Sequence, residues 1–195
     1  MYFLKLNHKS ITRNRSAMTT LCFCTLLVLG FVFAKELRAA NAQDDAQLAN
    51  KIKSAYLYNF LKFVEFGSSK ENKANFDVCI LGVDPFEDAL AKIATRKAKG
   101  KSVSIRKMLD VSETKSCDII YISQSKKLEL IPVLKELNSR SVLTVSDIEN
   151  FTQVGGIVRF FPHNGKIGIE INLTRARQSE IQISALLLEI ARVIE

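Results

Sequence analysis

The sequence predicts a three-layer α/β fold: a mainly parallel sheet of flavodoxin-like order, helices on both faces and a C-terminal antiparallel hairpin. Strand-like and helix-like segments alternate over residues 76–145, which is typical of parallel sheets with crossover helices. Near the C-terminus, an Asn-Gly pair separates two apolar runs and indicates a hairpin. Two cysteines, Cys79 and Cys117, lie in different predicted strands and limit the order of those strands.

The N-terminal segment has the pattern of a secretory signal peptide. Residues 1–20 contain four Lys/Arg and no acid, residues 21–34 form an apolar run, and small residues follow at positions 40 and 42. The apolar run is shorter than the roughly 20 residues that span a bilayer. We therefore expect residues 1–42 to be a signal peptide and residues 43–195 a single exported domain without stable membrane insertion. An uncleaved membrane anchor is the alternative.

The basic charge of the whole chain belongs largely to this leader. The leader holds six of the 28 Lys/Arg and only one of the 20 Asp/Glu, so the remainder has a net charge of about +3. Nucleic-acid-binding domains usually carry a concentrated basic footprint. We therefore expect no nucleic-acid partner.

Residues 46–65 predict an amphipathic helix with an unusually broad apolar stripe. Leu57, Leu61 and Val64 widen the stripe on one side, beyond what a helix lying on a single surface needs. Burial in the core and contact with a partner protein both explain the extra width. Leu57, Tyr58 and Leu61 are the candidate partner-binding residues.

Four strands and three helical segments are expected in the middle of the chain. The strands cover residues 76–81, 102–106, 117–123 and 141–145. A helix is expected to begin at Asp84, where Glu87 completes a capping box, and to end in the basic segment 92–100. A second helix is expected over residues 126–137, and a short helical turn after Ser146.

The C-terminal part predicts a hairpin and a final helix. The hairpin strands cover residues 157–161 and 166–172. Ser179 and Gln182 are expected to cap a helix whose apolar residues share one face. These residues are Ile183, Leu187, Ile190 and Ile194.

Cys79 and Cys117 form an even pair in a chain expected to be exported, where cysteine pairs usually form disulfides. A structural disulfide and two unpaired buried thiols both fit the sequence. A thioredoxin-like enzyme does not, because it requires a C-x-x-C pair. A disulfide requires Cα atoms about 4.4–6.8 Å apart, so the first and third strands would have to be adjacent. The order second-first-third-fourth meets this requirement, whereas the other common doubly wound order does not.

No catalytic residue, metal site or cofactor is assigned. His163 is the only histidine outside the leader and falls in the predicted hairpin turn. The turn at Gly82 has one glycine, and Asp84 would repel a phosphate there. The basic run over residues 92–107 suits either phosphate and glycan acids or a solvated surface, and no aromatic residue interleaves it.

Three segments resemble the YfiR-like family of periplasmic regulators. Residues 53–65 (KSAYLYNFLKFVE) resemble its opening helix, and residues 79–86 (CILGVDPF) resemble its first strand and turn. The glycine pair Gly155-Gly156, the segment 169–173 (IEINL) and the apolar residues after it resemble its closing section. The resemblance covers nearly all of the chain after residue 46.

The resemblance implies a non-enzymatic repressor in the periplasm of a Gram-negative bacterium. Such a protein binds the periplasmic sensor region of an inner-membrane diguanylate cyclase and lowers cyclic-di-GMP and biofilm formation. The resemblance also implies a Cys79–Cys117 disulfide and a tendency to form a homodimer. A second disulfide of the family has no counterpart here, and Phe66 stands where a tryptophan is frequent.

An alternative function is a periplasmic module that binds a small ligand or an envelope glycan. Its crevice would lie at the carboxyl ends of the strands, near Gly82 and Ser123, because ligands of open α/β sheets bind there.

Overall fold

The computed structural model describes residues 43–67 and 73–195 of the chain. The N-terminal helix covers residues 43–63. The other helical elements are η2 (Glu87–Ala89), α2 (Ala91–Ala94), η3 (Val111–Thr114), η4 (Gln124–Glu129), α3 (Leu130–Leu137), α4 (Leu173–Gln178) and α5 (Ala185–Glu189). The predicted leader lies outside the described residues.

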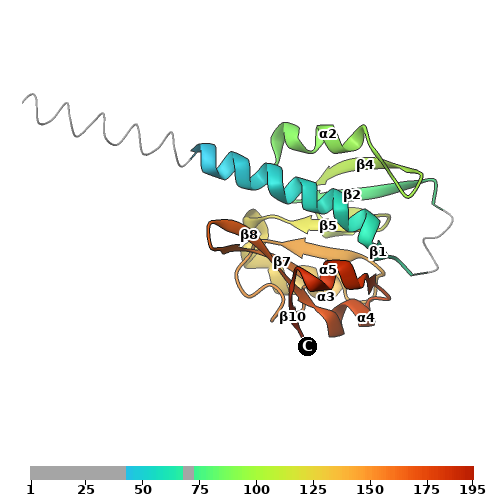
Figure 1. The fold of residues 1–195 in the computed structure, drawn as a ribbon. Coiled ribbons are helices and arrows are strands. Elements are labelled where there is room, and N and C mark those ends of the chain that lie inside the picture. The colour runs from blue at the N-terminus through green and yellow to red at the C-terminus, as the bar shows by residue number, and fades with distance from the viewer. Residues whose placement is uncertain (1–42, 68–72) are drawn as a thin grey trace, which may run out of the picture. The chain divides into compact units, whose positions relative to one another are not determined.

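Eight strands form one mixed sheet in the order β10-β8-β7-β6-β5-β2-β4-β3 (Figure 1). They are β2 (Asn75–Leu81), β3 (Lys97–Ala98), β4 (Lys101–Met108), β5 (Ile119–Ile122), β6 (Leu143–Ser146), β7 (Val158–His163), β8 (Lys166–Asn172) and β10 (Arg192–Ile194). β1 (Val64–Glu65) and β9 (Gln182–Ile183) form a separate antiparallel pair.

Most neighbours in the large sheet are parallel, as predicted, and only the β3–β4 and β7–β8 pairs are antiparallel. The four strands expected over residues 76–145 are β2, β4, β5 and β6, and they lie in the order β4-β2-β5-β6. The predicted adjacency of the first and third strands is confirmed, because β2 pairs with β5. Since further strands extend both edges, we describe the sheet as mixed α/β and do not give it the name of a known fold.

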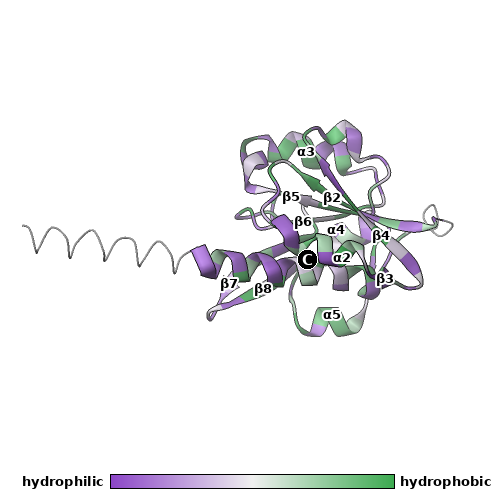
Figure 2. Cartoon of the chain, turned by 90° about the horizontal axis from the view of Figure 1, so that it is seen from above, coloured by the Kyte–Doolittle hydropathy of each residue, from purple (hydrophilic) through white to green (hydrophobic). Residues whose placement is uncertain are grey.

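The central strand β2 is buried on both faces. Val78 and Ile80 belong to the core cluster that contains Leu57 and Leu61 of the N-terminal helix. Cys79 and Leu81 point the other way and belong to a second cluster, which contains the apolar face of α3. Successive side chains of a strand point to opposite faces, so helices cover both faces of this part of the sheet. Figure 2 shows the apolar colour of the central strands.

The helix predicted from Asp84 to the basic segment 92–100 is wrong in extent. Asp84 Oδ1 accepts a hydrogen bond from the backbone N–H of Phe86, which forms a turn rather than a capping box. Glu87 has φ +48°, and only η2 and the four-residue α2 follow. Lys99 and Gly100 then adopt positive φ and turn β3 back onto β4. Left-handed backbone cannot continue a right-handed helix, so the element is interrupted at both places.

The predicted final helix is also wrong. The segment instead forms β9, α5 and β10, and Glu180, between the end of α4 at Gln178 and the start of β9, has φ +57°. Ser184 caps α5 through a hydrogen bond from Leu187, and the Ser184 N–H donates to the carbonyl of Phe63. The apolar residues at helical spacing therefore belong to several short elements instead of one helix. These elements pack against the end of the N-terminal helix. The expected helical turn after Ser146 is a series of turns instead.

The helix predicted over residues 126–137 and the C-terminal hairpin are confirmed, as η4–α3 and as β7–β8. In the hairpin, Asn164 and Gly165 have φ of +49° and +71°. Positive φ at both central residues gives the turn the twist of its flanking strands.

An ion triplet around a buried carboxylate joins the last three strands of the sheet. Glu170 of β8 is paired in register with Arg159 of β7 and Arg192 of β10. Its carboxylate is 3.0 Å from Arg159 Nε and 3.3 Å from Arg192 Nη1, and it accepts a hydrogen bond from Thr152. Glu170 is 1% exposed. The two arginines and Thr152 therefore supply partners for a carboxylate whose burial without partners would cost free energy.

We predict that this triplet makes stability depend on pH. Burial by itself would raise the pKa of Glu170, but the hydrogen bonds from Arg159 and Thr152 and the two arginine charges lower it below the ordinary 4.5. A lowered pKa contributes stability that is present above pH 4.5 and is lost as the pH falls through the folded-state pKa. Glu170→Gln should therefore lower the free energy of unfolding by about 3 kcal/mol at pH 7.

Urea unfolding from pH 7 to pH 3 tests the triplet. The difference between wild type and Glu170→Gln should shrink at the acid end. A difference that stays constant over this range would show that the charge of Glu170 does not stabilise the sheet.

Candidate functional site

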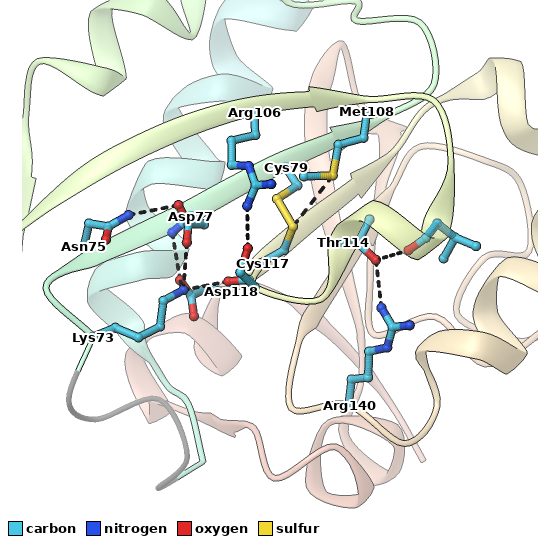
Figure 3. The surroundings of a disulfide bond; sticks show 12 residues. Lys73, Asn75, Asp77, Cys79, Arg106, Met108, Thr114, Cys117, Asp118 and Arg140 are labelled. Carbon is cyan, nitrogen blue, oxygen red and sulfur yellow. Dashed lines mark hydrogen bonds and ion pairs between the residues drawn. A yellow bond between two sulfur atoms is a disulfide. The ribbon is translucent and has the colours of Figure 1, made fainter.

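A disulfide joins β2 to the entrance of β5. The Cα atoms of Cys79 and Cys117 are 6.0 Å apart, and the two sulfur atoms are bonded. Both residues are almost fully buried, at 0% and 1% exposure, and Met108 Sδ lies 4.0 Å from Cys117 Sγ. Figure 3 shows the bond between the two strands, with Arg106 beside it. The buried sulfurs offer no accessible nucleophile, so the bond has the character of a structural cross-link.

A charged cluster lies next to the disulfide, at the amino ends of the same two strands (Figure 3). Lys73 Nζ is 2.7 Å from Asp118 Oδ2 and 2.9 Å from Asp77 Oδ2, and it donates to the carbonyl of Ser116. Asp118 Oδ2 also accepts a hydrogen bond from the backbone N–H of Asp77. Because one lysine and backbone donors satisfy both acids, the cluster fastens β2 to β5.

Side chains pack closely around Gly82, at the place where a ligand crevice is expected. A Cβ atom on Gly82 would lie 2.4 Å from Ser125 Oγ and 2.7 Å from Ser123 Oγ. The two hydroxyls are 2.7 Å apart, and Ser125 Oγ accepts a hydrogen bond from Val83 N–H. The ligand crevice expected at the carboxyl ends of the strands stays a prediction.

The charged groups around the carboxyl ends of the strands neutralise each other. Asp84 Oδ2 lies 2.8 Å from Lys107 Nζ, although this ion pair lacks hydrogen-bond geometry. Asp147 Oδ2 lies 2.5 Å from Lys53 Nζ. Burial, and next the charge of Asp147, raise the pKa of Tyr121, so its hydroxyl stays protonated at neutral pH. Among residues 43–67 and 73–195, no group of three or more His, Cys, Asp or Glu is arranged to hold a metal ion.

The residues predicted to contact a partner belong to the core. Leu57 and Leu61 are 0% exposed and Tyr58 is 8% exposed. The Tyr58 hydroxyl donates a hydrogen bond to the carbonyl of Lys97, which follows α2. The apolar stripe is broad because the sheet covers one side of the helix and the segment around α2 covers another. The prediction that Leu57, Tyr58 and Leu61 form a contact surface is corrected by this burial.

The exposed apolar residues of the same helix lie elsewhere. Leu48 is 57% exposed and Ile52 is 37% exposed, and a spacing of four places them on one side of the helix. Both belonged to the predicted stripe. Sequence periodicity could not separate them from the buried members, because it contains no information about where the sheet ends. A second exposed apolar pair, Leu186 and Ile190, lies on α5 and just after it, at 63% and 65% exposure.

The basic residues of the segment 92–107 differ in their contacts. Lys99 lies 2.5 Å from Glu65, and Lys107 pairs with Asp84. Lys92 and Arg96 instead line a groove beside the N-terminal helix. No sequence pattern indicates this groove, because its two walls are about 35 residues apart along the chain.

A protein-family model described as YfiR/HmsC-like matches residues 50–192, from within the N-terminal helix to the first residue of β10. No curated protein matches the chain. Within the part of the chain that the structure describes, no helix has both the length and the apolar character needed to cross a membrane.

We predict that the disulfide contributes strongly to stability. Replacing both cysteines, as Cys79→Ala with Cys117→Ala, should lower the free energy of unfolding by about 4 kcal/mol, because the unfolded chain loses a cross-link that closes a long loop. Urea unfolding of the oxidised wild type, the reduced wild type and the double variant measures this. Equal stability of all three proteins, or free thiols in protein purified from the periplasm, would contradict the prediction.

Substitutions in the N-terminal helix should distinguish core from surface. Leu61→Asp should destabilise the domain by more than about 3 kcal/mol, because it buries an unpaired carboxylate. Ile52→Asp on the exposed side should cost less than about 1 kcal/mol. Thermal unfolding followed by circular dichroism compares the two, and a stable Leu61→Asp protein would contradict the burial of this residue.

Proposed function

The chain belongs to the YfiR/HmsC-like family, and we propose that it is a periplasmic protein that represses an inner-membrane diguanylate cyclase by direct contact. It binds the periplasmic sensor region of the cyclase, and this binding lowers cyclic-di-GMP and biofilm formation. The observation that carries the proposal is the family match over residues 50–192.

The chemistry of the domain supports a regulatory rather than a catalytic role. The acids of the carboxyl edge and of the β2–β5 cluster are bound to lysines or backbone donors. A general acid or base needs a free group within reach of a substrate. The two sulfurs are joined and buried. These groups therefore serve the fold, and the function we propose needs only a binding surface.

A periplasmic location is supported by the cross-link as well as by the family. Disulfides persist in oxidising compartments such as the periplasm and are rare in the cytosol. The Cys79–Cys117 bond suits that environment. In this proposal residues 1–42 are the signal peptide and residues 43–195 the single mature domain. The tendency to dimerise remains a prediction from the resemblance.

We place the cyclase contact on the exposed side of the N-terminal helix, at Leu48 and Ile52. These residues replace the buried Leu57, Tyr58 and Leu61 as candidates, because a partner can reach them without unfolding the domain. Apolar anchors near the centre of an interface usually carry a large share of the binding energy.

The variant Leu48→Asp with Ile52→Asp tests this contact. It should remain folded but bind the membrane-anchored cyclase more weakly, by about 2 kcal/mol or roughly 30-fold. Co-purification from membranes, with identification of the captured protein, measures binding, and cellular cyclic-di-GMP measures repression. Cyclic-di-GMP should rise towards the level of a strain that lacks the protein.

The matched control is Leu186→Asp with Ile190→Asp, which changes two exposed apolar residues in another part of the domain. If only this control loses repression, the contact lies at α5 and our placement is wrong. If wild-type protein captures no diguanylate cyclase and its deletion leaves cyclic-di-GMP unchanged, the proposed function itself is overturned.

A further inference from the structure

A groove runs between the N-terminal helix and the segment η2–α2, which lie on the same side of the sheet (Figure 1). One part of the groove has a cavity volume of 310 Å³. Its floor is apolar and consists of Ala55, Tyr58, Ala89 and Ile93. A volume near the lower end of the range for ligand pockets suits a small molecule.

A second cavity of 290 Å³ continues the groove towards the amino end of the helix. Its walls include polar residues such as Asn50 and Glu87. Four residues line both cavities: Lys51, Asp88, Ala89 and Lys92. The two cavities therefore form one groove that is apolar at one end and polar at the other.

Hydrogen bonds hold the two walls together near each end. Asn50 Nδ2 donates to the carbonyl of Pro85 over 2.7 Å, and the Tyr58 hydroxyl donates to the carbonyl of Lys97 over 2.9 Å. Because these bonds fix the distance between the walls, the groove exists before any ligand arrives.

The rim of the groove is positively charged. Lys51, Lys92 and Arg96 form no ion pair with any acid of residues 43–67 and 73–195. Many other cations of the domain are paired, including Lys53, whose amine meets Asp147. The acids of the groove lining are Asp88 and Glu87, so the three cations leave the lining with a net positive charge that attracts anions.

The aromatic ring of Tyr58 adds to this arrangement. Lys62 Nζ lies 4.4 Å from the ring centroid, and the Arg96 guanidinium carbon lies 5.4 Å from it. These contacts hold the Arg96 side chain near the apolar end of the groove. The Arg96 guanidinium therefore lies close to the end of an apolar ligand body that would occupy the groove.

We propose that this groove binds a small amphipathic anion, a carboxylate joined to a compact apolar body. The apolar body lies on Ala55, Tyr58 and Ile93, and the carboxylate is bound by Lys92 and Arg96. The site is distinct from the surface proposed for the cyclase, and the inference does not depend on that partner.

Naphthalene-2-carboxylate and its neutral amide, naphthalene-2-carboxamide, are suitable probes because they differ in charge and hardly in shape. Isothermal titration of the mature protein should show saturable binding of the carboxylate, at least about tenfold tighter than that of the amide. High salt should weaken it. In amide-resolved NMR spectra, the shifts should be concentrated at the groove residues, Ala55, Ala89 and Ile93 among them.

Two variants test the site. Lys92→Glu with Arg96→Glu should weaken binding of the carboxylate about tenfold or more and leave binding of the amide nearly unchanged. Ala55→Trp should fill the apolar end and abolish binding of both probes. The matched control is Lys127→Glu with Lys135→Glu, which makes the same charge change at exposed lysines of η4 and α3 and should leave binding unchanged.

Several results would overturn the inference. These are equal affinity for carboxylate and amide, no saturable binding of either, NMR shifts centred on another surface, and equal weakening by the control pair. Circular dichroism checks the fold of each variant. If Ala55→Trp does not fold, the charge-reversal pair and its control still decide the question.

Discussion

The structure depends on the pairing of β2 with β5. β2 pairs along its length with β4 on one side and with β5 on the other. The Cys79–Cys117 bond and the contacts of Lys73 with Asp77 and Asp118 fasten β2 to the residues just before β5. This attachment makes β2 an interior strand, so its side chains must be buried on both faces. One face carries the N-terminal helix and the other carries α3.

Burial of the N-terminal helix has two consequences for function. Because the sheet and the segment around α2 both cover it, Leu57 and Leu61 become core residues and are lost as contact residues. The contact with α2 is incomplete, since small residues such as Ala55 and Ala89 leave the groove open between the two elements. The helix therefore contributes to the core, to one wall of the groove and, at Leu48 and Ile52, to the exposed surface.

The charged residues are also divided between the folded interior and the surface. The ion pairs of Glu170, Asp118 and Asp147 connect elements that are distant in the sequence, and each is at least partly buried. In a setting of low dielectric constant, these acids require partners. Of the cations that form no ion pair, Lys51, Lys92 and Arg96 lie at the rim of the groove. The ion pairs thus stabilise the fold, and the cations at the rim of the groove are available to bind a ligand.

The sequence by itself determined the elements that depend on local chemistry. The alternation of short strands and helices, the Asn164-Gly165 turn and the α3 helix follow from backbone preference and hydrophobic period, which act over a few residues. The cysteine spacing correctly placed the first and third strands together, given that the bond forms. The motifs of residues 53–65 and 79–86 and the closing section after Gly155, taken together in their order and spacing, identified the family.

Only the tertiary structure decided how the apolar residues are divided between core and surface. Positions such as Leu48 and Leu61 look alike in the sequence, and the position of the sheet determines which of them is buried. The same holds for the C-terminal segment, where helical spacing around Leu187 is satisfied by α5 and β10 instead of one helix. It also holds for the groove, whose walls meet only after folding. The physical reason is that burial and strand pairing depend on contacts between distant parts of the chain. Local propensity reflects only neighbouring residues and carries no information about those contacts.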